Sequence, residues 1–264
     1  MNGNPIGFID SGIGGLSVWK SVVRLLPQES TVYIGDHAYM PYSDKSGYSV
    51  RNRITKMIRR LTEMNCKAIV IACNTATVAG IGIYRKRFSD IPIIGVVPVI
   101  KTATEITKTG HIAVLATPFT VKSRYHRSLI RKFANGIKVT SIGCRNLVTL
   151  IETGEISPNS VGQALSVLTE RLSGSDIDVV ALGCTHYPLI RSIIRKITGK
   201  SVKLLDSGNA VARQTKRILV HNSILSNGNN IRYDFYTTGN PVAVTRIVRK
   251  VTGEIHEFRR IKLG

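Results

Sequence analysis

The stretch "DVVALGCTHYPLI", residues 178–190, is the most informative about the fold, because its apolar run stops at a cysteine and then turns polar. Val179 to Leu182 are apolar at consecutive positions, which is typical of a parallel strand covered by helices on both faces. The stretch "AIVIACNTAT", residues 68–77, repeats the pattern. Cys73 and Cys184 therefore occupy equivalent positions in two similar segments.

Short apolar runs alternate along the whole chain with segments of helical pattern. The expected strands are "IGFI", "TVYIGD", "KAIVIAC", "IPIIGVV", "HIAVLAT", "IKVTSIG", "DVVALGC" and "VKLLD". This alternation predicts an α/β fold with mainly parallel sheets. Ligands of such folds bind beyond the carboxyl ends of the strands.

Polar motifs follow five of these runs. They are Asp10 to Gly12, Asp36 to Ser43, Cys73 to Thr75, Thr117, and Cys184 to His186. We expect two pseudo-symmetric, doubly wound α/β domains with the active site between them. The first covers residues 1–97 and 210–264 and carries Cys73, and the second covers 98–209 and carries Cys184, with Pro98 at the crossing.

The chain has 264 residues, and 43% of them are hydrophobic. This content is enough to bury a sizeable core, which argues against overall disorder. No apolar run approaches the roughly 20 residues that span a bilayer, and the N-terminus "MNGNPIGFIDSG" lacks a secretion signal. We expect a cytoplasmic protein without a membrane partner. The four cysteines form no CxxC pair, which argues against a disulfide framework or a structural zinc site.

The charge balance is strongly basic, with 37 Lys and Arg against 16 Asp and Glu and a net charge of +21. Such a balance ordinarily indicates an anionic partner such as nucleic acid. The basic residues are scattered over helical segments such as 51–61, 121–133 and 191–200, without a block of six like charges. We therefore favour solvated helix faces over a nucleic-acid site.

Cys73 is expected at the N-terminus of a helix, where unpaired N–H groups and the backbone dipole favour a thiolate. Asn74 and Thr75 add donors that suit an anion. The alternative is a buried cysteine that only ends a strand.

Cys184 is followed by a hydroxyl, Thr185, and by His186, an acid or base near neutral pH. Pro188 suits the first turn of a following helix. Three reactive groups in consecutive positions seldom serve packing alone. A zinc site is disfavoured because no two further ligands stand at a suitable spacing.

The glycine-rich stretch "FIDSGIGGLSV", residues 8–18, fails the dinucleotide pattern, since Ser17 stands where the third glycine belongs. Asp10 would repel a phosphate, so we interpret it as a proton-handling or amine-binding carboxylate. An Asx turn is the alternative. The loop at residues 35–46 is expected to close over the strand ends and exclude water.

Two thiols, a carboxylate and an imidazole, without a metal cage or nucleotide loop, narrow the chemistry. Hydrolysis by a Cys–His pair needs one thiol, not two in opposite domains. Two facing thiols suit a reaction that is symmetric about one carbon, because one thiolate removes a proton and the other thiol returns one to the opposite face. These residues therefore predict racemisation.

The chain resembles the glutamate racemases of the aspartate/glutamate racemase superfamily. The matching stretches are "FIDSGIGGLSV", "MPYSDKS", "IACNTAT" and "LGCTHYPL". The resemblance runs from Ile6 to about Ser207, and the combination is far more specific than any one stretch. Thr185 and His186 after Cys184 favour the glutamate branch, because aspartate racemases usually carry Glu after the corresponding Cys-Thr.

The resemblance implies that Cys73 and Cys184 are the two acid/bases, with no cofactor and no metal. Cys184 would take the α-proton of L-glutamate and Cys73 that of D-glutamate, assisted by His186 and Asp10 respectively. The residues implied to bind glutamate are Asp10, Ser11, Pro41, Tyr42, Ser43, Asn74, Thr75, Thr117, Thr185 and His186. The product D-glutamate would feed peptidoglycan synthesis.

Two positions depart from the family pattern: Ser43 stands where glycine is usual, and Phe119 lies in a loop that commonly has glycine before Thr120. Both concern the geometry of the carboxylate pocket. Glu152 matches a family acid near the site. Another acid substrate and a basic nucleic-acid-binding protein remain the alternative functions, and the oligomeric state is open, a homodimer included.

Overall fold

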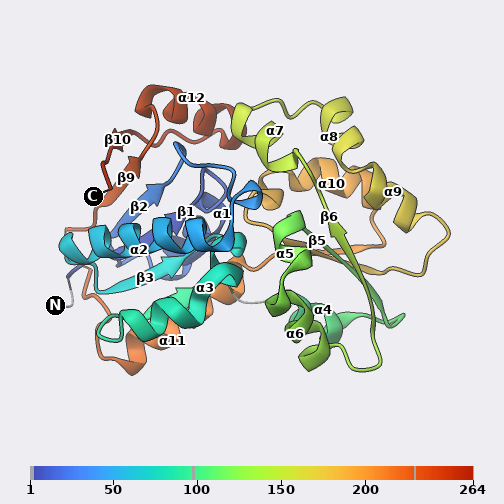
Figure 1. The fold of residues 1–264 in the computed structure, drawn as a ribbon, viewed down its shortest axis with the longest axis horizontal. Coiled ribbons are helices and arrows are strands. Elements are labelled where there is room, and N and C mark those ends of the chain that lie inside the picture. Colours follow the sequence, from blue (N-terminus) through green and yellow to red (C-terminus); the bar gives the residue numbers. More distant parts are fainter. Residues whose placement is uncertain (1–2, 97–98, 229, 264) are drawn as a thin grey trace. The chain divides into compact units, whose positions relative to one another are not determined.

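The computed structural model describes residues 3–96, 99–228 and 230–263, which form two compact units (Figure 1). Unit 1 comprises Met1–Val97 and Gly208–Gly264, and unit 2 comprises Pro98–Ser207. The predicted crossing at Pro98 lies outside the described residues. The predicted division into two domains, residues 1–97 with 210–264 and residues 98–209, stays a prediction.

Unit 1 is built on a six-stranded sheet whose neighbouring strands are all parallel, in the order β10-β9-β2-β1-β3-β4. Its strands are β1 Ile6–Asp10, β2 Thr31–Gly35, β3 Ala68–Ile71, β4 Ile93–Gly95, β9 Tyr233–Thr237 and β10 Phe258–Arg260. Its helices are α1 Leu16–Leu25, the short η1 Tyr42–Asp44, α2 Gly47–Glu63, α3 Asn74–Arg87, α11 Gly208–His221 and α12 Pro241–Thr252.

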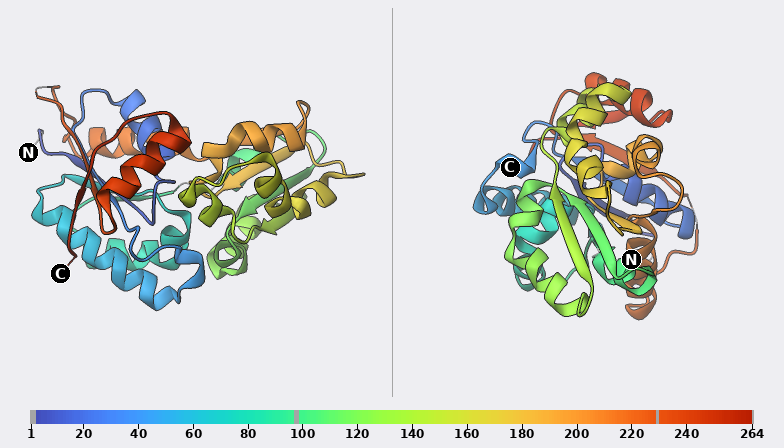
Figure 2. Two further views of the ribbon diagram at one scale, coloured as in Figure 1. Left: turned by 90° about the horizontal axis from the view of Figure 1, so that it is seen from above. Right: turned by 90° about the vertical axis from the view of Figure 1, so that its right-hand side faces the viewer.

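Helices cover both faces of this sheet (Figures 1 and 2). Helices α2 and α3 pack together, and α1 packs against α11. Right-handed crossovers explain the division, because the chain moves from β1 to β2 in one direction and from β2 to β3 in the other. On the α2 side, Ile9, Ile34 and Ile71 form one fully buried cluster with Ile54 and Met57 of α2.

Unit 2 is built on a four-stranded parallel sheet in the order β6-β5-β7-β8. Its strands are β5 His111–Ala116, β6 Lys138–Gly143, β7 Val179–Gly183 and β8 Lys203–Leu205. Its helices are α4 Val99–Ile106, α5 Pro118–Lys122, α6 Arg124–Phe133, α7 Leu147–Thr153, α8 Pro158–Ala164, α9 Ser166–Leu172, the short η2 Tyr187–Ile190 and α10 Arg191–Thr198. Its core joins Ile112 and Val179 of the sheet to Val99 and Ala103 of α4.

The predicted α/β class with parallel sheets is confirmed, and each of the eight apolar runs forms one of the strands β1 to β8. The tail after residue 226 adds β9 beside β2 and so reaches the sheet's central strands.

The five strand ends chosen for their polar motifs are also confirmed: β1, β2, β3, β5 and β7 end at Asp10, Gly35, Ile71, Ala116 and Gly183. Asp10 pairs with Gly35 in register, and Ala116 pairs with Gly183. Within each unit, the polar motifs therefore lie at one edge of the sheet.

Candidate active site

Cys73 lies at the carboxyl edge of unit 1, where it occupies the N-cap position of α3. Its side chain is buried, and its Sγ lies 3.9 Å from the Ser11 hydroxyl. The unpaired N–H groups and the dipole of the helix favour the thiolate at this position. Asn74 and Thr75 form the first turn of α3, and the buried Oδ1 of Asn74 has no hydrogen-bond partner among the described residues.

Asp10 is fully buried at the end of β1 and holds the glycine-rich turn before α1. Its Oδ2 accepts hydrogen bonds from the amides of Gly12 at 3.1 Å and Gly15 at 3.0 Å. The Asx turn considered from the sequence is thus present. Gly15 is required by close approach, because a Cβ there would lie 2.6 Å from Asp10 Cβ and 2.7 Å from the Tyr33 hydroxyl.

The loop between β2 and α2 carries the predicted Pro41, Tyr42 and Ser43. Pro41 and Ser43 are partly exposed, whereas Tyr42 is buried and donates a 2.8 Å hydrogen bond to Asp36. Burial raises the pKa of Tyr42, and the negative charges of Asp36 and Cys73 raise it further. The phenol therefore stays protonated and lies within electrostatic range of Cys73.

Tyr84, in α3, is a neighbour of Cys73 that the sequence analysis missed. It is fully buried, and its hydroxyl has no hydrogen-bond partner within the described ranges. Burial raises its pKa, and the charge of Cys73 adds to the rise. No sequence signal distinguishes it from an ordinary core tyrosine.

In unit 2, Cys184, His186 and Glu152 form a buried thiol–imidazole–carboxylate chain. The Sγ of Cys184 lies 3.7 Å from His186 Nδ1, and His186 Nε2 lies 2.6 Å from Glu152 Oε1. Burial alone lowers the pKa of His186, but the hydrogen bonds to Cys184 and Glu152 outweigh burial and raise it well above the ordinary value. The imidazolium is therefore favoured beside the Cys184 sulfur, where it stabilises a thiolate.

Cys144 and Tyr187 complete the surroundings of Cys184. Cys144 follows β6 as Cys184 follows β7, and the last residues of both strands pair with Ala116. Burial, and then the charge of Cys184, raises the pKa of Cys144 to about 12. Burial and the charge of Cys184 likewise raise the pKa of Tyr187. Cys144 could have been found from sequence, because it too ends an apolar run, whereas Tyr187 carries no such signal.

Thr117 and Thr185 are both buried in unit 2. Thr117 is the N-cap of α5, where its Oγ1 accepts from the Thr120 amide at 3.3 Å and lies 3.0 Å from the Thr120 hydroxyl. Phe119 is partly buried in the same short helix. Thr117 thus has a structural role, and its contact with substrate stays a prediction.

The structure places the predicted residues at or after the carboxyl ends of strands in both units. Those in unit 1 are Asp10, Ser11, Pro41, Tyr42, Ser43, Cys73, Asn74 and Thr75, and those in unit 2 are Thr117, Cys184, Thr185 and His186. In the described part of the chain, no group of three His, Cys, Asp or Glu side chains has the arrangement of a metal site. Among the described helices, none is long and apolar enough to cross a membrane.

Comparison with known proteins decides the family, because the model of the Asp/Glu/Hydantoin racemases matches residues 6–215. The chain belongs to this racemase family. A glutamate racemase from Clostridium botulinum (strain Alaska E43 / Type E3) is 40% identical to this racemase over 222 residues, which cover 84% of this chain and 86% of the relative.

Solved structures agree with this assignment. A glutamate racemase isoform from Bacillus anthracis has a TM-score of 0.88 and 35% identity, and a glutamate racemase from Francisella tularensis in complex with D-glutamate has a TM-score of 0.88 and 31% identity. Each alignment covers 100% of this chain and 99% of the other. The resemblance inferred from the sequence is confirmed, and this racemase is an isomerase.

Proposed function

We propose that this racemase interconverts L- and D-glutamate without a cofactor, with Cys73 and Cys184 as its two acid/bases. The observation that carries the proposal is that each thiol follows a strand at the carboxyl edge of its own sheet, beside its own polar partners. For Cys73 these include Ser11, and for Cys184 they are His186 and Glu152. The names of the relatives support glutamate as the substrate.

In the L-to-D direction, the Cys184 thiolate takes the α-proton while the Cys73 thiol donates a proton to the opposite face of the α-carbon. The reaction leaves a Cys184 thiol and a Cys73 thiolate, which is the state that the reverse direction needs. This mechanism requires both sulfurs to contact opposite faces of one substrate. His186 would assist Cys184, and Asp10 would assist Cys73.

A thiolate is a weak base toward an amino-acid α-proton, so the site must stabilise the carbanion-like transition state more than the substrate. Amide and hydroxyl donors at the strand ends suit this role, because charge spreads onto the α-carboxylate as the proton leaves. The proposed substrate contacts are Asp10, Ser11, Pro41, Tyr42, Ser43, Asn74, Thr75, Thr117, Thr185 and His186.

The proposed biological role is to supply D-glutamate for peptidoglycan, and so for cell-wall synthesis and cell shape, in the cytoplasm. The partner of the reaction is then a free amino acid. A homodimer is compatible with the mechanism, which takes both thiols from one chain.

Racemisation of L-glutamate in D2O tests the two-thiol mechanism. Early D-glutamate should carry deuterium, because a deuterated Cys73 delivers it, and recovered L-glutamate should carry almost none. Mass spectrometry of both pools checks this result. Deuterium that appears equally in both pools from the start would contradict two separate bases, and turnover of another acid alone would contradict glutamate as the substrate.

Alanine variants test the role of each thiol, with Cys66→Ala as the matched control. Cys73→Ala and Cys184→Ala should each abolish racemisation in both directions, because each direction needs one thiolate and one thiol. Cys66→Ala should retain the wild-type rate. Cys66 is also a buried thiol, but it precedes β3, whereas Cys73 follows the other end of this strand. Comparable racemisation by Cys73→Ala would overturn the assignment.

A further inference from the structure

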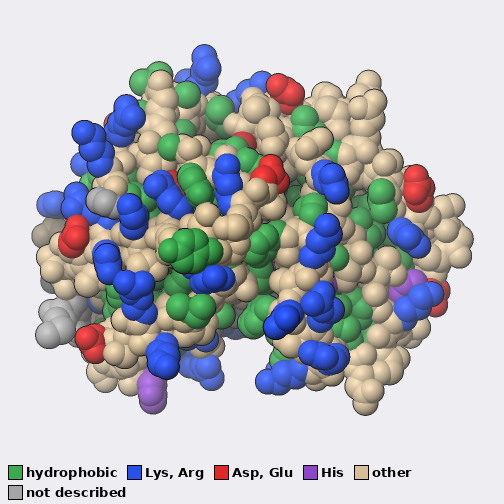
Figure 3. Space-filling view, viewed as in Figure 1, with side chains coloured by type: hydrophobic (Ala, Val, Ile, Leu, Met, Phe, Trp, Pro, Cys, Tyr) green, Lys and Arg blue, Asp and Glu red, His purple; other side chains and the backbone are tan. Residues whose placement is uncertain are grey.

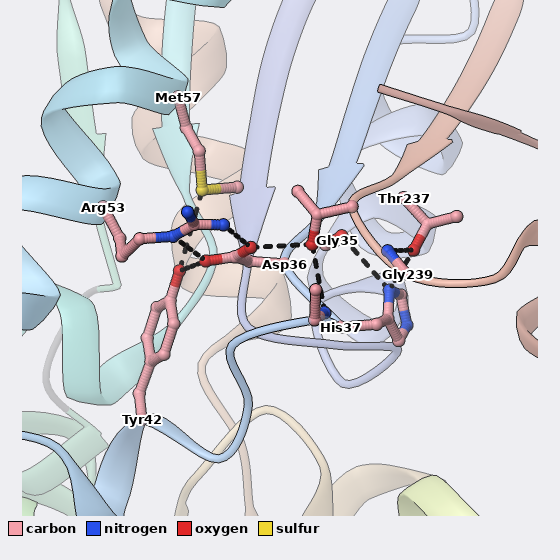
Figure 4. A network of polar contacts seen from close by, with 10 residues as sticks. Gly35, Asp36, His37, Tyr42, Arg53, Met57, Thr237 and Gly239 are labelled. Atoms are coloured by element: carbon pink, nitrogen blue, oxygen red, sulfur yellow. Dashed lines mark hydrogen bonds and ion pairs between the residues drawn. The ribbon is translucent and has the colours of Figure 1, made fainter. Parts of the chain in front are cut away.

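The loop that carries Tyr42 and Ser43 is fastened at its first residue, Asp36 (Figure 4). Asp36 is fully buried, and its amide donates a 3.0 Å hydrogen bond to the carbonyl of Asp10. The Tyr42 hydroxyl donates to Asp36 Oδ2 at 2.8 Å. One buried carboxylate therefore ties the start of the loop to the residues that the proposed function places at the substrate.

Arg53, on α2, supplies the positive charge that faces this carboxylate. Its Nε donates to Asp36 Oδ2 at 2.9 Å and its Nη2 donates to Oδ1 at 2.5 Å, a bidentate geometry. The guanidinium also lies 5.0 Å from the centre of the Tyr39 ring, in the middle of the loop. The Arg53 side chain is 24% exposed.

The end of β9 holds the same loop from the other side. The Thr238 hydroxyl donates to Asp36 Oδ1 at 2.8 Å and accepts from the Ala38 amide at 3.1 Å. Thr237 Oγ1 lies 2.8 Å from His37 Nδ1. The C-terminal part of unit 1 therefore contributes directly to the position of the loop.

We propose that Arg53 is a positioning residue that locks the loop of residues 37–45 in its substrate-binding conformation by neutralising Asp36. Removal of one partner from a buried ion pair leaves an uncompensated charge, which is strongly unfavourable. Without Arg53, Asp36 moves toward water and releases Tyr42. Arg53 acts through the loop and does not touch the substrate, and its kinetic effect rests on the proposed function.

Hydrogen–deuterium exchange of the free protein tests the lock without reference to activity. In Arg53→Met, amides of residues 37–45 should exchange about tenfold faster than in the wild type. Arg60→Met is the matched control, because Arg60 lies on the same helix in an exposed ion pair with Glu63. It should leave the exchange unchanged. Wild-type exchange in Arg53→Met would overturn the proposal.

Kinetics test the link to the site. Arg53→Met should raise the KM for glutamate about tenfold and change kcat less than about threefold, and Arg53→Lys should restore part of the affinity. An unchanged KM would show that the loop does not position the substrate. If Arg53→Met does not fold, Thr238→Val tests the same proposal, because Thr238 follows β9 and makes two contacts with the loop. This variant should accelerate the exchange of the amides of residues 37–45 about threefold. Wild-type protein that does not racemise glutamate would refute the proposed function and leave the exchange result intact.

Discussion

At the scale of single residues, the two thiols have different surroundings. The Cys184 sulfur contacts the buried imidazole of His186, which forms a hydrogen bond with the buried carboxylate of Glu152. The Cys73 sulfur lies at the N-terminus of α3 and contacts the Ser11 hydroxyl. A cation stabilises one thiolate, and backbone amides and the helix dipole stabilise the other. In the proposed mechanism each direction uses a different thiolate, and the two surroundings are two physical routes to stabilising it.

Glu152→Gln should destabilise the protein by about 1–3 kcal/mol at pH 6, since it removes the charged partner of His186. The folded-state pKa of His186 is raised above its ordinary value of about 6.5. This interaction therefore contributes stability that is fully present below about pH 6.5 and is lost as pH rises through the folded-state pKa. The difference from wild type should shrink as pH rises through the folded-state pKa, as denaturant unfolding at pH 6 and at a pH above that pKa would measure.

Glu155→Gln provides the control, because it removes the same charge from an exposed position three residues away. Its effect should be within about 0.5 kcal/mol of zero at both pH values. A Glu152→Gln difference that grows with pH would contradict the protonated His186.

At the scale of elements, helix α3 links the chemistry to the core. It begins at Cys73 and is kinked at Gly80, whose φ of −174° and ψ of 25° interrupt the helical geometry. The freed Ala79 carbonyl accepts a 3.2 Å hydrogen bond from Arg51 on α2. A side chain of the neighbouring helix thus forms a hydrogen bond at the kink, and Tyr84 lies in the half of α3 that follows it.

Gly80→Ala should destabilise the protein by about 1–3 kcal/mol through overpacking. A Cβ at this position would lie 2.9 Å from Arg51 Cγ and 3.0 Å from Tyr84 Cζ. Arg51 can move, but the Tyr84 ring is fully buried. Gly82→Ala in the same helix meets no atom within 4 Å and should instead stabilise by up to about 1 kcal/mol. Denaturant unfolding of both variants checks the contrast, and equal effects would show that the kink is not packed as described.

At the scale of the whole molecule, the net charge of +21 is the outstanding property. Lys and Arg side chains are spread over the face in Figure 3 and do not gather in one patch. Several are in ion pairs with carboxylates, as in Lys20 with Glu254 and Arg259 with Asp234. A dispersed positive charge attracts polyanions weakly and without a defined site.

Binding of a short DNA duplex should therefore be detectable only at low ionic strength and should weaken to a Kd above about 10 μM at roughly 150 mM salt. The physical reason is that counterion release drives such binding, and salt removes that driving force. Fluorescence anisotropy across a salt series measures it. Submicromolar binding that persists at the higher salt would instead support a dedicated nucleic-acid site.

Sequence alone was enough to predict the fold class, the strands β1 to β8 and the position of Cys73 and Cys184 after strand ends. These features are local, because consecutive apolar residues mark a buried parallel strand and the residue after it must lie at the carboxyl edge of the sheet. The Cys184–His186 contact could be predicted for the same reason, as two positions separate the residues. The family resemblance added the proposed substrate and the proposed roles of these residues.

The contacts between distant groups at these sites emerged only in the tertiary structure, and this includes Glu152, which the family resemblance had placed near the site without a partner. Glu152 reaches His186 across 34 positions, and Thr238 reaches Asp36 across 202. Such contacts depend on the order of strands in each sheet and on which face each crossover helix covers, which local periodicity does not encode. The pairing of Asp36 with Arg53 is of the same kind, because it forms only when α2 packs over the sheet and buries a carboxylate that needs a cation.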